Sequence, residues 1–175
     1  MPEVPPDGLC LSAFVVLASE ERPERVLLGK LDPEAPWDHL GALDPSRVAA
    51  WRDLWMLPAS HLLLLEDPND AALRILRELV GRPPRPLEGP LVASEVYAPA
   101  RHPERAHHWD LEFIFRGRVH EREVARPKAW RELTFVDPGP LGPGEFARAH
   151  DDILARAGAL LGTPRKGAAG RPRAG

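Results

Sequence analysis

The sequence predicts an α/β fold in which a mixed β-sheet lies between helices. Two observations lead to this prediction. Apolar segments of strand length come first, a helix with clear start and stop signals follows them, and further strands precede an amphipathic segment near the end. The chain has 175 residues, 43% of them hydrophobic, which is enough for one domain with a sizeable core.

The first elements are predicted to be two strands and a short helix. Residues Leu9–Ala18 are apolar throughout, which is typical of a strand buried on both faces. Residues Arg25–Lys30 follow a charged turn and predict its hairpin partner. After a proline-containing loop, Asp44-Pro45 has the pattern of an N-cap and a first helical residue, which predicts a helix over 44–54. Residues 55–58 then form an extended segment.

A second helix is predicted with both of its ends. Asp67-Pro68 repeats the start signal, and Asp70 stands in the position of a capping box. Gly81 has the residue type that commonly follows the last turn of a helix. The four prolines within 82–90 exclude a continuation of the helix. The sequence therefore predicts a helix over Pro68–Val80.

The rest of the domain is predicted to contain three strands and a terminal helix. Leu91–Tyr97, Trp109–Val119 and Leu133–Val136 have strand patterns. Apolar residues at helical spacing predict a helix over Gly144–Leu161. Residues 163–175 contain no large apolar residue, so we expect a single domain over 1–162 followed by a disordered basic tail.

Composition and charge exclude several classes of protein. The net charge is −3, which does not favour a chain-wide surface for nucleic acid or anionic membranes. The run Leu9–Ala18 is too short to span a bilayer. Glu3 and Asp7 precede it, where a secretory signal would carry basic residues. We therefore expect a cytoplasmic protein that binds neither nucleic acid nor membranes.

The amide and proline content has two explanations. The chain contains 21 prolines, a single asparagine, Asn69, and no glutamine. Few thermolabile amides and many loop prolines are typical of a thermophilic protein, but a GC-rich genome produces a similar bias. Both explanations stay open.

The segment around the second helix carries a family resemblance. Trp55–Gly81 reads WMLPASHLLLLEDPNDAALRILRELVG and resembles the Nudix box, G-x5-E-x7-R-E-U-x-E-E-x-G-U, in which U is aliphatic. The matching positions, with Ser60 in place of the leading glycine, are Glu66, Arg74, Leu76, Glu78 and Gly81. Leu57-Pro58 matches the usual entry to the box. The resemblance covers about residues 9–161 and implies a Nudix-type α/β/α sandwich, as in the MutT-like hydrolases.

The departures from this pattern affect the metal binding and hydrolysis that the resemblance would otherwise imply. In active members, three carboxylates on one face of the box helix hold a divalent metal that polarises a pyrophosphate and helps to activate water. Here those positions are Ile75, Glu78 and Leu79, so one carboxylate remains. Ala59-Ser60 also replaces the usual glycine pair. The resemblance therefore implies at most weak binding of Mg²⁺ or Mn²⁺ through Glu78, and no other cofactor.

Five residues are candidates for the site. Glu66 and Glu78 are the candidate catalytic residues, and Arg74, Trp109 and Glu112 are candidate ligand-binding residues. Each has an alternative role. Glu78 can pair with Arg74 one helical turn away, and Glu66 can interact with the dipole at the helix N-terminus. Glu112 can belong to a salt-bridged strand face, and Trp109 can belong to the core instead of stacking on a base.

Two apolar features favour packing in place of a metal site. Leu62–Leu65 is a run of four leucines that we do not expect to stay solvated. The helix 68–80 is apolar on almost all sides, so we expect its former metal face to be covered. The leucine run, the helix 44–54 and a second subunit are the three candidates for covering it.

Two functional hypotheses follow. In the first, the chain is a Nudix-like domain that binds a nucleotide or related pyrophosphate ligand, or a protein partner, with little or no hydrolysis, and it forms a homodimer through the apolar helix. In the second, it hydrolyses nucleoside diphosphate derivatives with Mg²⁺ or Mn²⁺ and a rearranged set of carboxylates. Metal binding separates the two.

Overall fold

The computed structural model describes residues 9–35, 49–84, 86–97, 108–148 and 150–158. A six-stranded sheet has the order β4-β5-β1-β2-β6, and β3 pairs with β1 beside this path. The strands are β1 Leu9–Ser19, β2 Val26–Leu31, β3 Ala59–His61, β4 Glu88–Tyr97, β5 His108–Val119 and β6 Trp130–Val136. β1 and β5 run parallel and the other pairs are antiparallel, so the sheet is mixed, as predicted.

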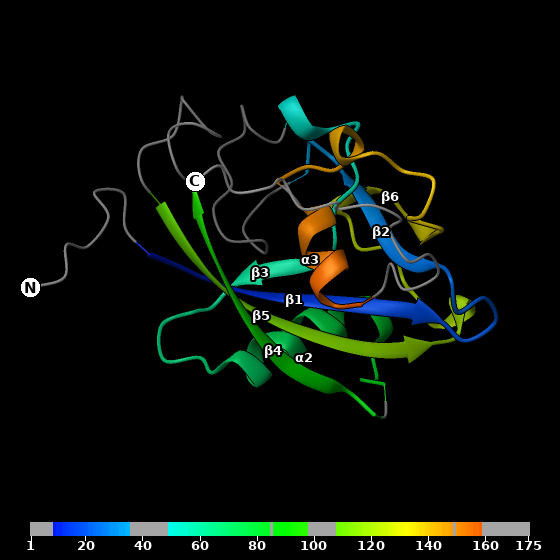
Figure 1. Ribbon diagram of the computed structural model, residues 1–175. Helices are drawn as coiled ribbons and strands as arrows, with labels where there is room; N and C mark the ends of the chain where they lie inside the picture. The colour runs from blue at the N-terminus through cyan, green and yellow to red at the C-terminus, as the bar shows by residue number, and fades with distance from the viewer. Residues whose placement is uncertain (1–8, 36–48, 85, 98–107, 149, 159–175) are drawn as a thin grey trace, which may run out of the picture.

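Helices cover both faces of the sheet (Figure 1). Helix α2, Pro68–Val80, lies on one face and the short helix α3, His150–Arg156, lies on the other. The side chains of β1 alternate between the two layers: Val15 and Leu17 join the core cluster of α2, and Phe14 and Val16 join the cluster of α3. The prediction of a strand buried on both faces is confirmed.

Helix α2 has the predicted bounds. The carboxylate of Asp67 accepts hydrogen bonds from the backbone N–H groups of Asn69 and Asp70 at 2.7 and 3.1 Å, which satisfies two donors of the first turn. Gly81 ends the helix with φ +65°, a backbone conformation that residues with a Cβ rarely adopt. Local cap chemistry therefore determines both ends.

Two strands are longer than predicted. β4 begins at Glu88 because its edge position tolerates Pro90 and because Glu88 pairs with Arg116 across the strands, with 2.7 Å between Oε2 and Nη2. β6 begins at Trp130, since pairing with β2 extends over the polar residues 131–132. Tertiary pairing decides these starts, and the apolar pattern alone misses them.

The predicted terminal helix is shorter than expected and starts later. Over 144–148 the prediction is wrong: Pro143–Glu145 forms a 3-10 turn, and Phe146 forms a parallel bridge with Trp55. The N–H of Trp55 donates to the carbonyl of Glu145 at 2.8 Å, and Ala147 N–H donates to the carbonyl of Trp55 at 3.0 Å. The extended pairing buries Phe146, a residue that the apolar spacing had assigned to the terminal helix.

Other expectations fall partly or wholly outside the described residues. Of the helix over 44–54, residues 49–51 are helical and 44–48 lie outside. The tail 163–175 also lies outside. No helix in the described ranges is long and apolar enough to cross a membrane.

The apolar face of α2 is buried in the chain's own core. Ile75 and Leu79 are 5% and 2% exposed and belong to the cluster that includes Val15, Leu17 and Phe115 of the sheet. The sheet therefore covers this face of α2, and a second subunit is not needed to cover it. Arg77 and Glu78 are exposed, so the helix is amphipathic and not apolar on all sides.

The leucine run departs from its prediction. Leu62 packs partly against the core cluster of α2, but Leu63, Leu64 and Leu65 are exposed. The reason lies in the turn that they form, in which the N–H of Glu66 donates to the carbonyl of Leu63 at 3.0 Å. A tight turn directs its central side chains outward.

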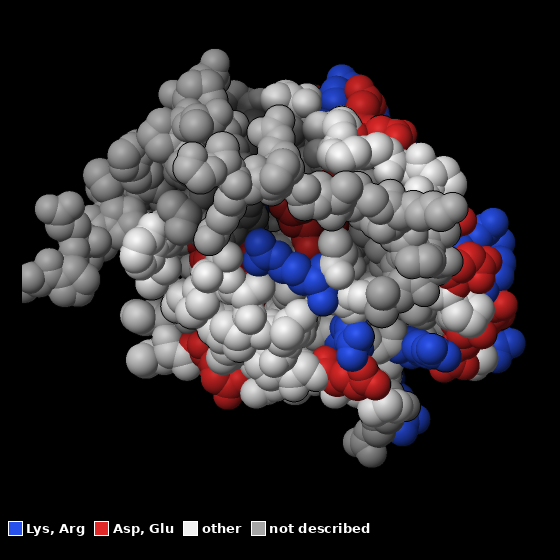
Figure 2. Space-filling view, in the orientation of Figure 1, with Lys and Arg blue, Asp and Glu red and all other residues white. Residues whose placement is uncertain are grey.

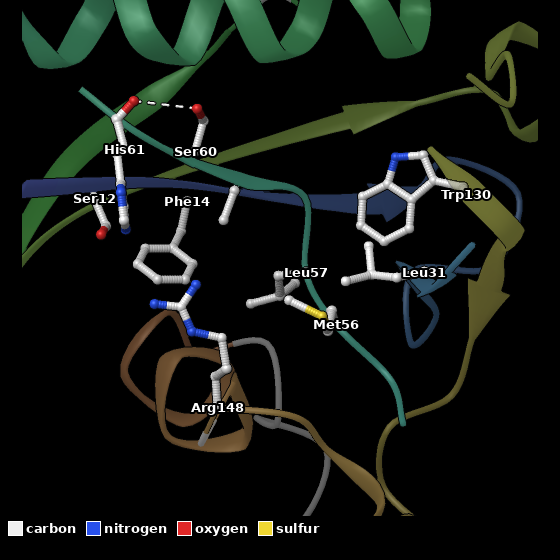
Figure 3. A pocket seen from close by; sticks show the side chains of 10 residues that line it. Ser12, Phe14, Leu31, Met56, Leu57, Ser60, His61, Trp130 and Arg148 are labelled. Atoms are coloured by element: carbon white, nitrogen blue, oxygen red, sulfur yellow. Dashed lines mark hydrogen bonds between the residues drawn. The ribbon is translucent and has the colours of Figure 1, made fainter. Parts of the chain in front are cut away.

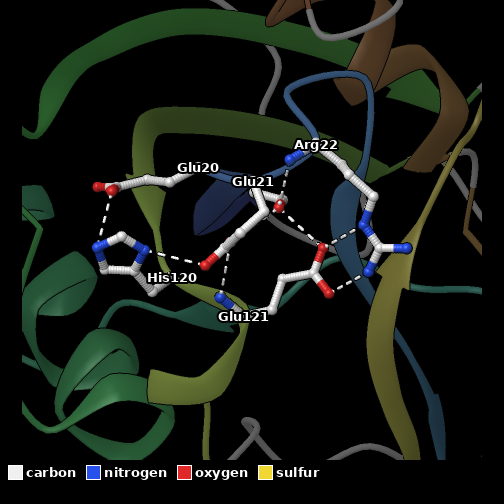
Figure 4. A network of polar contacts seen from close by, with 6 residues as sticks. Glu20, Glu21, Arg22, His120 and Glu121 are labelled. Atoms are coloured by element: carbon white, nitrogen blue, oxygen red, sulfur yellow. Dashed lines mark hydrogen bonds and ion pairs between the residues drawn. The ribbon is translucent and has the colours of Figure 1, made fainter.

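A polar network ties the β1–β2 turn to the end of β5 (Figure 4). Both ring nitrogens of His120 lie 3.0 Å from carboxylates, one from Glu20 and one from Glu21. Arg22 donates through Nε to Oε1 of Glu121 at 2.9 Å. A backbone hydrogen bond from Glu121 and the bond to His120 lower the pKa of Glu21 to about 2. Among the described residues on the face in Figure 2, acidic and basic side chains are interleaved.

Candidate functional site

The box loop is clamped by an arginine–glutamate pair. The guanidinium of Arg74 donates to both carboxylate oxygens of Glu66, at 2.8 and 2.7 Å. It also donates to Oγ of Ser60 at 3.1 Å and to the carbonyl of His61 at 3.0 Å. Glu66 accepts the N–H of Leu63 at 2.9 Å. One side chain of α2 thus holds β3 and the following turn together.

This clamp defines the state of two candidate residues. The hydrogen bonds from Arg74 lower the pKa of Glu66, and the bonds to Glu66 raise the pKa of Arg74. Both groups are charged at neutral pH and are bound to each other. Among the described residues the ion pair of Arg74 is with Glu66 and not with Glu78. Their hydrogen-bonding capacity is largely used in holding the loop.

Glu78 lies at a small hollow beside this clamp. The hollow has a cavity volume of about 10 Å³, and its lining residues are Pro58, Ala59, Ser60, Arg74, Ile75, Glu78, Leu79 and Trp130. Glu78 is the carboxylate of that lining. Ile75 and Leu79 line it with hydrocarbon at the positions where the family pattern has glutamates.

The donor set does not fit a tightly held divalent cation. Mg²⁺ takes near-octahedral oxygen coordination, which one carboxylate cannot approach without several further oxygen ligands. Across the described ranges, no three His, Cys, Asp or Glu side chains are grouped to hold a metal ion.

A second hollow adjoins the first on the α3 side of the sheet (Figure 3). Its cavity volume is about 20 Å³, roughly the space of one water molecule, and it shares Ala59, Ser60 and Trp130 with the first. Its lining residues are Ser12, Phe14, Leu31, Met56, Leu57, Ala59, Ser60, His61, Trp130 and Arg148. We call it the Trp130 pocket. Its walls are mainly apolar and aromatic, with a few polar groups at one end, which is the usual composition of a small-molecule site.

The indole of Trp130 packs against a glycine in the neighbouring strand, β2. A Cβ on Gly29 would lie 2.6 Å from Cζ3 of Trp130 and 2.9 Å from the carbonyl oxygen of Glu132, which is closer than real Cβ atoms come. The indole therefore occupies the place of the missing side chain and is 5% exposed. The sequence around Trp130 carries no local signal of this role, because the strand that it packs against, β2, lies far away along the chain.

Arg148 is the cationic group of the pocket. Its backbone is left-handed, with φ +56°, which is uncommon for a residue with a Cβ and costs about 1 kcal/mol or more. The guanidinium points into the pocket in Figure 3. Its centre lies 5.9 Å from the ring centroid of Trp51. Within the described ranges no carboxylate lies within ion-pair distance of it.

A buried histidine supports the pocket from behind. His150 is 1% exposed, and its Nδ1 accepts the N–H of Leu57 at 2.9 Å. Its ring meets that of Phe14 edge to face, with centroids 5.3 Å apart. Burial lowers the pKa of His150 to about 3, with a smaller contribution from Arg148. The imidazole is therefore neutral and positions the chain that enters the box loop.

The remaining candidates lie on opposite faces of the sheet. Glu112 is buried on the α3 face beside Ser12, and its Oε2 accepts from Nη1 of Arg156 at 3.1 Å. Trp109 pairs with Leu9 on the α2 face and is 46% exposed. Neither residue lines either hollow, so the structure does not bring Arg74, Trp109 and Glu112 into one site.

Comparison by sequence finds no family model that matches the chain and no match among curated proteins. Comparison by structure finds Nudix proteins. The chain is similar to the NUDIX domain of Shewanella oneidensis NrtR, whose structure contains ADP ribose (TM-score 0.59, 16% identity, 88% of this chain and 89% of that one). A MutT NUDIX hydrolase from Burkholderia pseudomallei gives a TM-score of 0.56 at 17% identity, covering 85% and 97%.

A third similar structure is the E. coli dihydroneopterin triphosphate pyrophosphohydrolase (TM-score 0.56, 16% identity, 87% and 96% covered). At these identities the likeness defines the architecture: the chain has the Nudix fold, as its box-like segment predicted. Activity has to be argued from the site itself.

Proposed function

We propose that the chain binds a nucleotide-type ligand with an anionic phosphate or pyrophosphate group in the Trp130 pocket, with little or no hydrolysis. One observation carries the proposal: the guanidinium of Arg148 faces an aromatic pocket without a carboxylate partner in the described ranges. Arginine is well suited to phosphate because its planar fork of donors matches two phosphate oxygens.

The neighbouring groups suit the rest of such a ligand. The rings of Trp130 and Phe14 and the hydroxyl groups of Ser12 and Ser60 line the pocket, but all four residues are buried, so a base enters only if the pocket widens. The box loop forms the common wall of both hollows through Ala59 and Ser60. Among structural neighbours, an ADP-ribose complex and a triphosphate pyrophosphohydrolase are consistent with this ligand class but do not identify it.

Several observations support weak or absent hydrolysis. Glu66 is held by Arg74 and Glu112 by Arg156, so two of the carboxylates that an alternative set would need already have cationic partners. Glu78 remains at the first hollow between two aliphatic residues. A metal role for Glu78 is therefore weak at most.

Calorimetric titration with a panel of nucleoside mono- and diphosphates and sugar nucleotides, without metal, tests binding. Arg148→Gln should weaken the Kd of any binder at least tenfold, since a hydrogen bond to a charged group contributes about 1.5–3 kcal/mol. Arg77→Gln is the matched control, because Arg77 is exposed on α2 and lines neither hollow. Equal loss in both variants, or no binder in the panel, would contradict the proposal.

The second candidate is a Mg²⁺- or Mn²⁺-dependent hydrolase of nucleoside diphosphate derivatives. The exposure of Glu78 at the hollow is the observation that favours it. Phosphate release measured with the same panel and each metal separates the two functions. Turnover of about 1 s⁻¹ or more that disappears in Glu78→Gln would establish the hydrolase and displace the binding function.

We also propose that the protein is cytoplasmic. Of the two explanations for its amide and proline content, we propose adaptation to heat. A nucleotide-type ligand and a single cysteine, Cys10, suit the cytoplasm. A melting temperature above about 80 °C, well beyond the mesophilic range, would favour heat adaptation over genome composition.

A further inference from the structure

We propose that the chain forms a two-fold symmetric homodimer through an exposed apolar surface on the α2 face of the sheet. This leucine surface comprises Leu9, Leu11, Leu63, Leu64, Leu65, Val92 and Trp109. It lies outside both hollows, so the proposal does not depend on the proposed function. It also differs from the predicted dimer through the apolar helix, whose face the chain's own sheet buries.

The members of the leucine surface are contiguous. Leu9 pairs with Trp109 across the parallel strands β1 and β5, and Leu11 pairs with Leu111. The N–H of Leu62 donates to the carbonyl of Leu11 at 2.9 Å, which places the leucine turn beside the start of β1. In Figure 1 the starts of β1 and β5 and the turn before α2 all lie at the left of the view.

All of these side chains share one face of the sheet. Residues paired directly across two strands project to the same side, and side chains alternate along each strand. Leu9 and Leu11 therefore project with Ala13 and Val15, which belong to the core cluster of α2. Val92 joins them because it pairs with Phe113. The charged residues of this part of β5 project to the other face, so the centre of the leucine surface carries no charge.

The turn forms a rigid apolar projection. Leu64 and Leu65 are 93% and 98% exposed, and Leu65 has a left-handed φ of +67°. A branched side chain in that conformation costs about 1 kcal/mol or more. The bidentate Arg74–Glu66 pair holds the turn, so binding through it would lose little conformational entropy.

The area of the surface fits a second copy. Leu9, Leu11, Leu63, Val92 and Trp109 are 54%, 37%, 58%, 54% and 46% exposed. Together with Leu64 and Leu65 they amount to more than four fully exposed large side chains. If each is given roughly 150 Å², the lower value for aromatic residues and an upper value for Leu and Val, the surface measures up to about 650 Å². A standard interface buries about 800 Å² per partner, and the largest apolar patch of a typical monomer measures about 300–600 Å².

Shape and charge also favour a second copy. A two-fold contact needs a surface that is complementary to itself. This surface has the projecting pair Leu64–Leu65 next to the flatter strip of Leu9, Leu11 and Trp109, so each copy can place its projection on the strip of the other. Each chain carries a net charge of −3, and an uncharged contact places no like charges opposite each other. Higher salt should therefore strengthen the dimer, because it screens long-range repulsion.

Sedimentation velocity of the full chain over about 1–100 µM, the range of modest affinities, tests the proposal. The expected result is a concentration-dependent species with twice the chain mass of 19.4 kDa, favoured by 0.5 M NaCl. Leu64→Asp with Leu65→Asn should weaken association at least tenfold. This double variant should fold normally, because both side chains are exposed and Asn tolerates a positive φ. Leu91→Asn is the matched control: Leu91 is also 46% exposed but lies on the other face of the sheet, opposite Ile114.

A mixing experiment tests the two-fold arrangement. Trp109→Ser should also prevent self-association, since it removes part of the strip. A mixture of this variant with the Leu64/Leu65 variant retains one intact contact and should associate more strongly than either variant alone. A chain that stays monomeric at all concentrations, a dimer that survives the Leu64/Leu65 change, or a monomer that binds lipid vesicles through these leucines would each overturn the proposal.

Discussion

The Nδ1 atom of His150 in α3 accepts the backbone N–H of Leu57 at a distance of 2.9 Å, inside the core. This bond requires an unprotonated Nδ1. His150 is 1% exposed, so water hardly reaches its ring. The entry to the box loop and the back of the Trp130 pocket thus depend on a neutral histidine. The protonation state of one buried ring couples the fold to pH.

His150 should make the fold sensitive to mild acid. Its pKa falls from 6.5 in the unfolded chain to about 3 in the folded protein, so between these values the unfolded chain binds more protons. Stability is therefore complete above pH 6.5 and is lost as the pH falls towards 3. At about two pH units below the unfolded value, the loss should be on the order of 2 kcal/mol.

Urea unfolding of the wild type and His150→Asn at pH 7.5 and 4.5 measures this effect. The amide oxygen of Asn can accept the Leu57 N–H without titrating. The variant should therefore lose less stability between the two pH values than the wild type does. An identical loss in both proteins would show that other groups cause the acid sensitivity.

Glu21 should contribute at a lower pH. Its pKa is depressed from 4.5 to about 2 by the backbone N–H of Glu121 and by His120, so its contribution is present above pH 4.5 and is lost as the pH falls towards 2 (Figure 4). Glu21→Gln should flatten acid unfolding in this window and leave the window of His150 unchanged. Circular dichroism during acid titration distinguishes the two windows.

The Arg74–Glu66 clamp should show strong coupling. Arg74→Met leaves the mostly buried carboxylate of Glu66 without its cation and should cost about 2–4 kcal/mol. Glu66→Gln should cost less, and the double variant should cost less than the sum, because each change removes the same interaction. Arg77→Met on the exposed face of α2 should stay within about 0.5 kcal/mol. Additive effects in the cycle would contradict the clamp.

The glycine opposite Trp130 should be sensitive to a single methyl group. Gly29→Ala places a Cβ against the indole and the carbonyl of Glu132, and overpacking of this kind costs about 1–3 kcal/mol. Trp130→Leu should restore part of the stability in the Gly29→Ala background. It should not restore ligand binding, because the ring surface of the pocket is lost. Thermal melts and the nucleotide titration provide the two measurements.

Glutamates at the family positions of α2 should not restore a metal site. Ile75→Glu with Leu79→Glu would bury two carboxylates near the cluster of Val15 and Leu17, at several kcal/mol each. The double variant should unfold or melt far below the wild type, with and without Mg²⁺. A stable variant whose melting temperature rises with Mg²⁺ would show that the hollow accommodates both carboxylates and can hold metal.

Local chemistry in the sequence determined several elements without tertiary information. Asp67 and Gly81 define both ends of α2, because caps act through neighbouring backbone groups. The apolar run of β1 predicted burial on both faces. The spacing of Glu66, Arg74 and Glu78 carried the likeness to the Nudix box, and the fold agrees with it. These signals lie within about twenty residues, so one segment contains all the interacting parts.

Only the tertiary structure decided the composition of the site. Trp130 depends on Gly29 in another strand, His150 on Leu57, and Arg148 enters the same pocket from the loop before α3. Phe146 pairs with Trp55 where its spacing predicted a helix. Glu112 and Trp109 lie on opposite faces of β5, and which face meets the hollows depends on the packing of α2 and α3. Contacts between distant segments produce no periodic pattern in the sequence of either segment, because the two segments meet only after the sheet has formed.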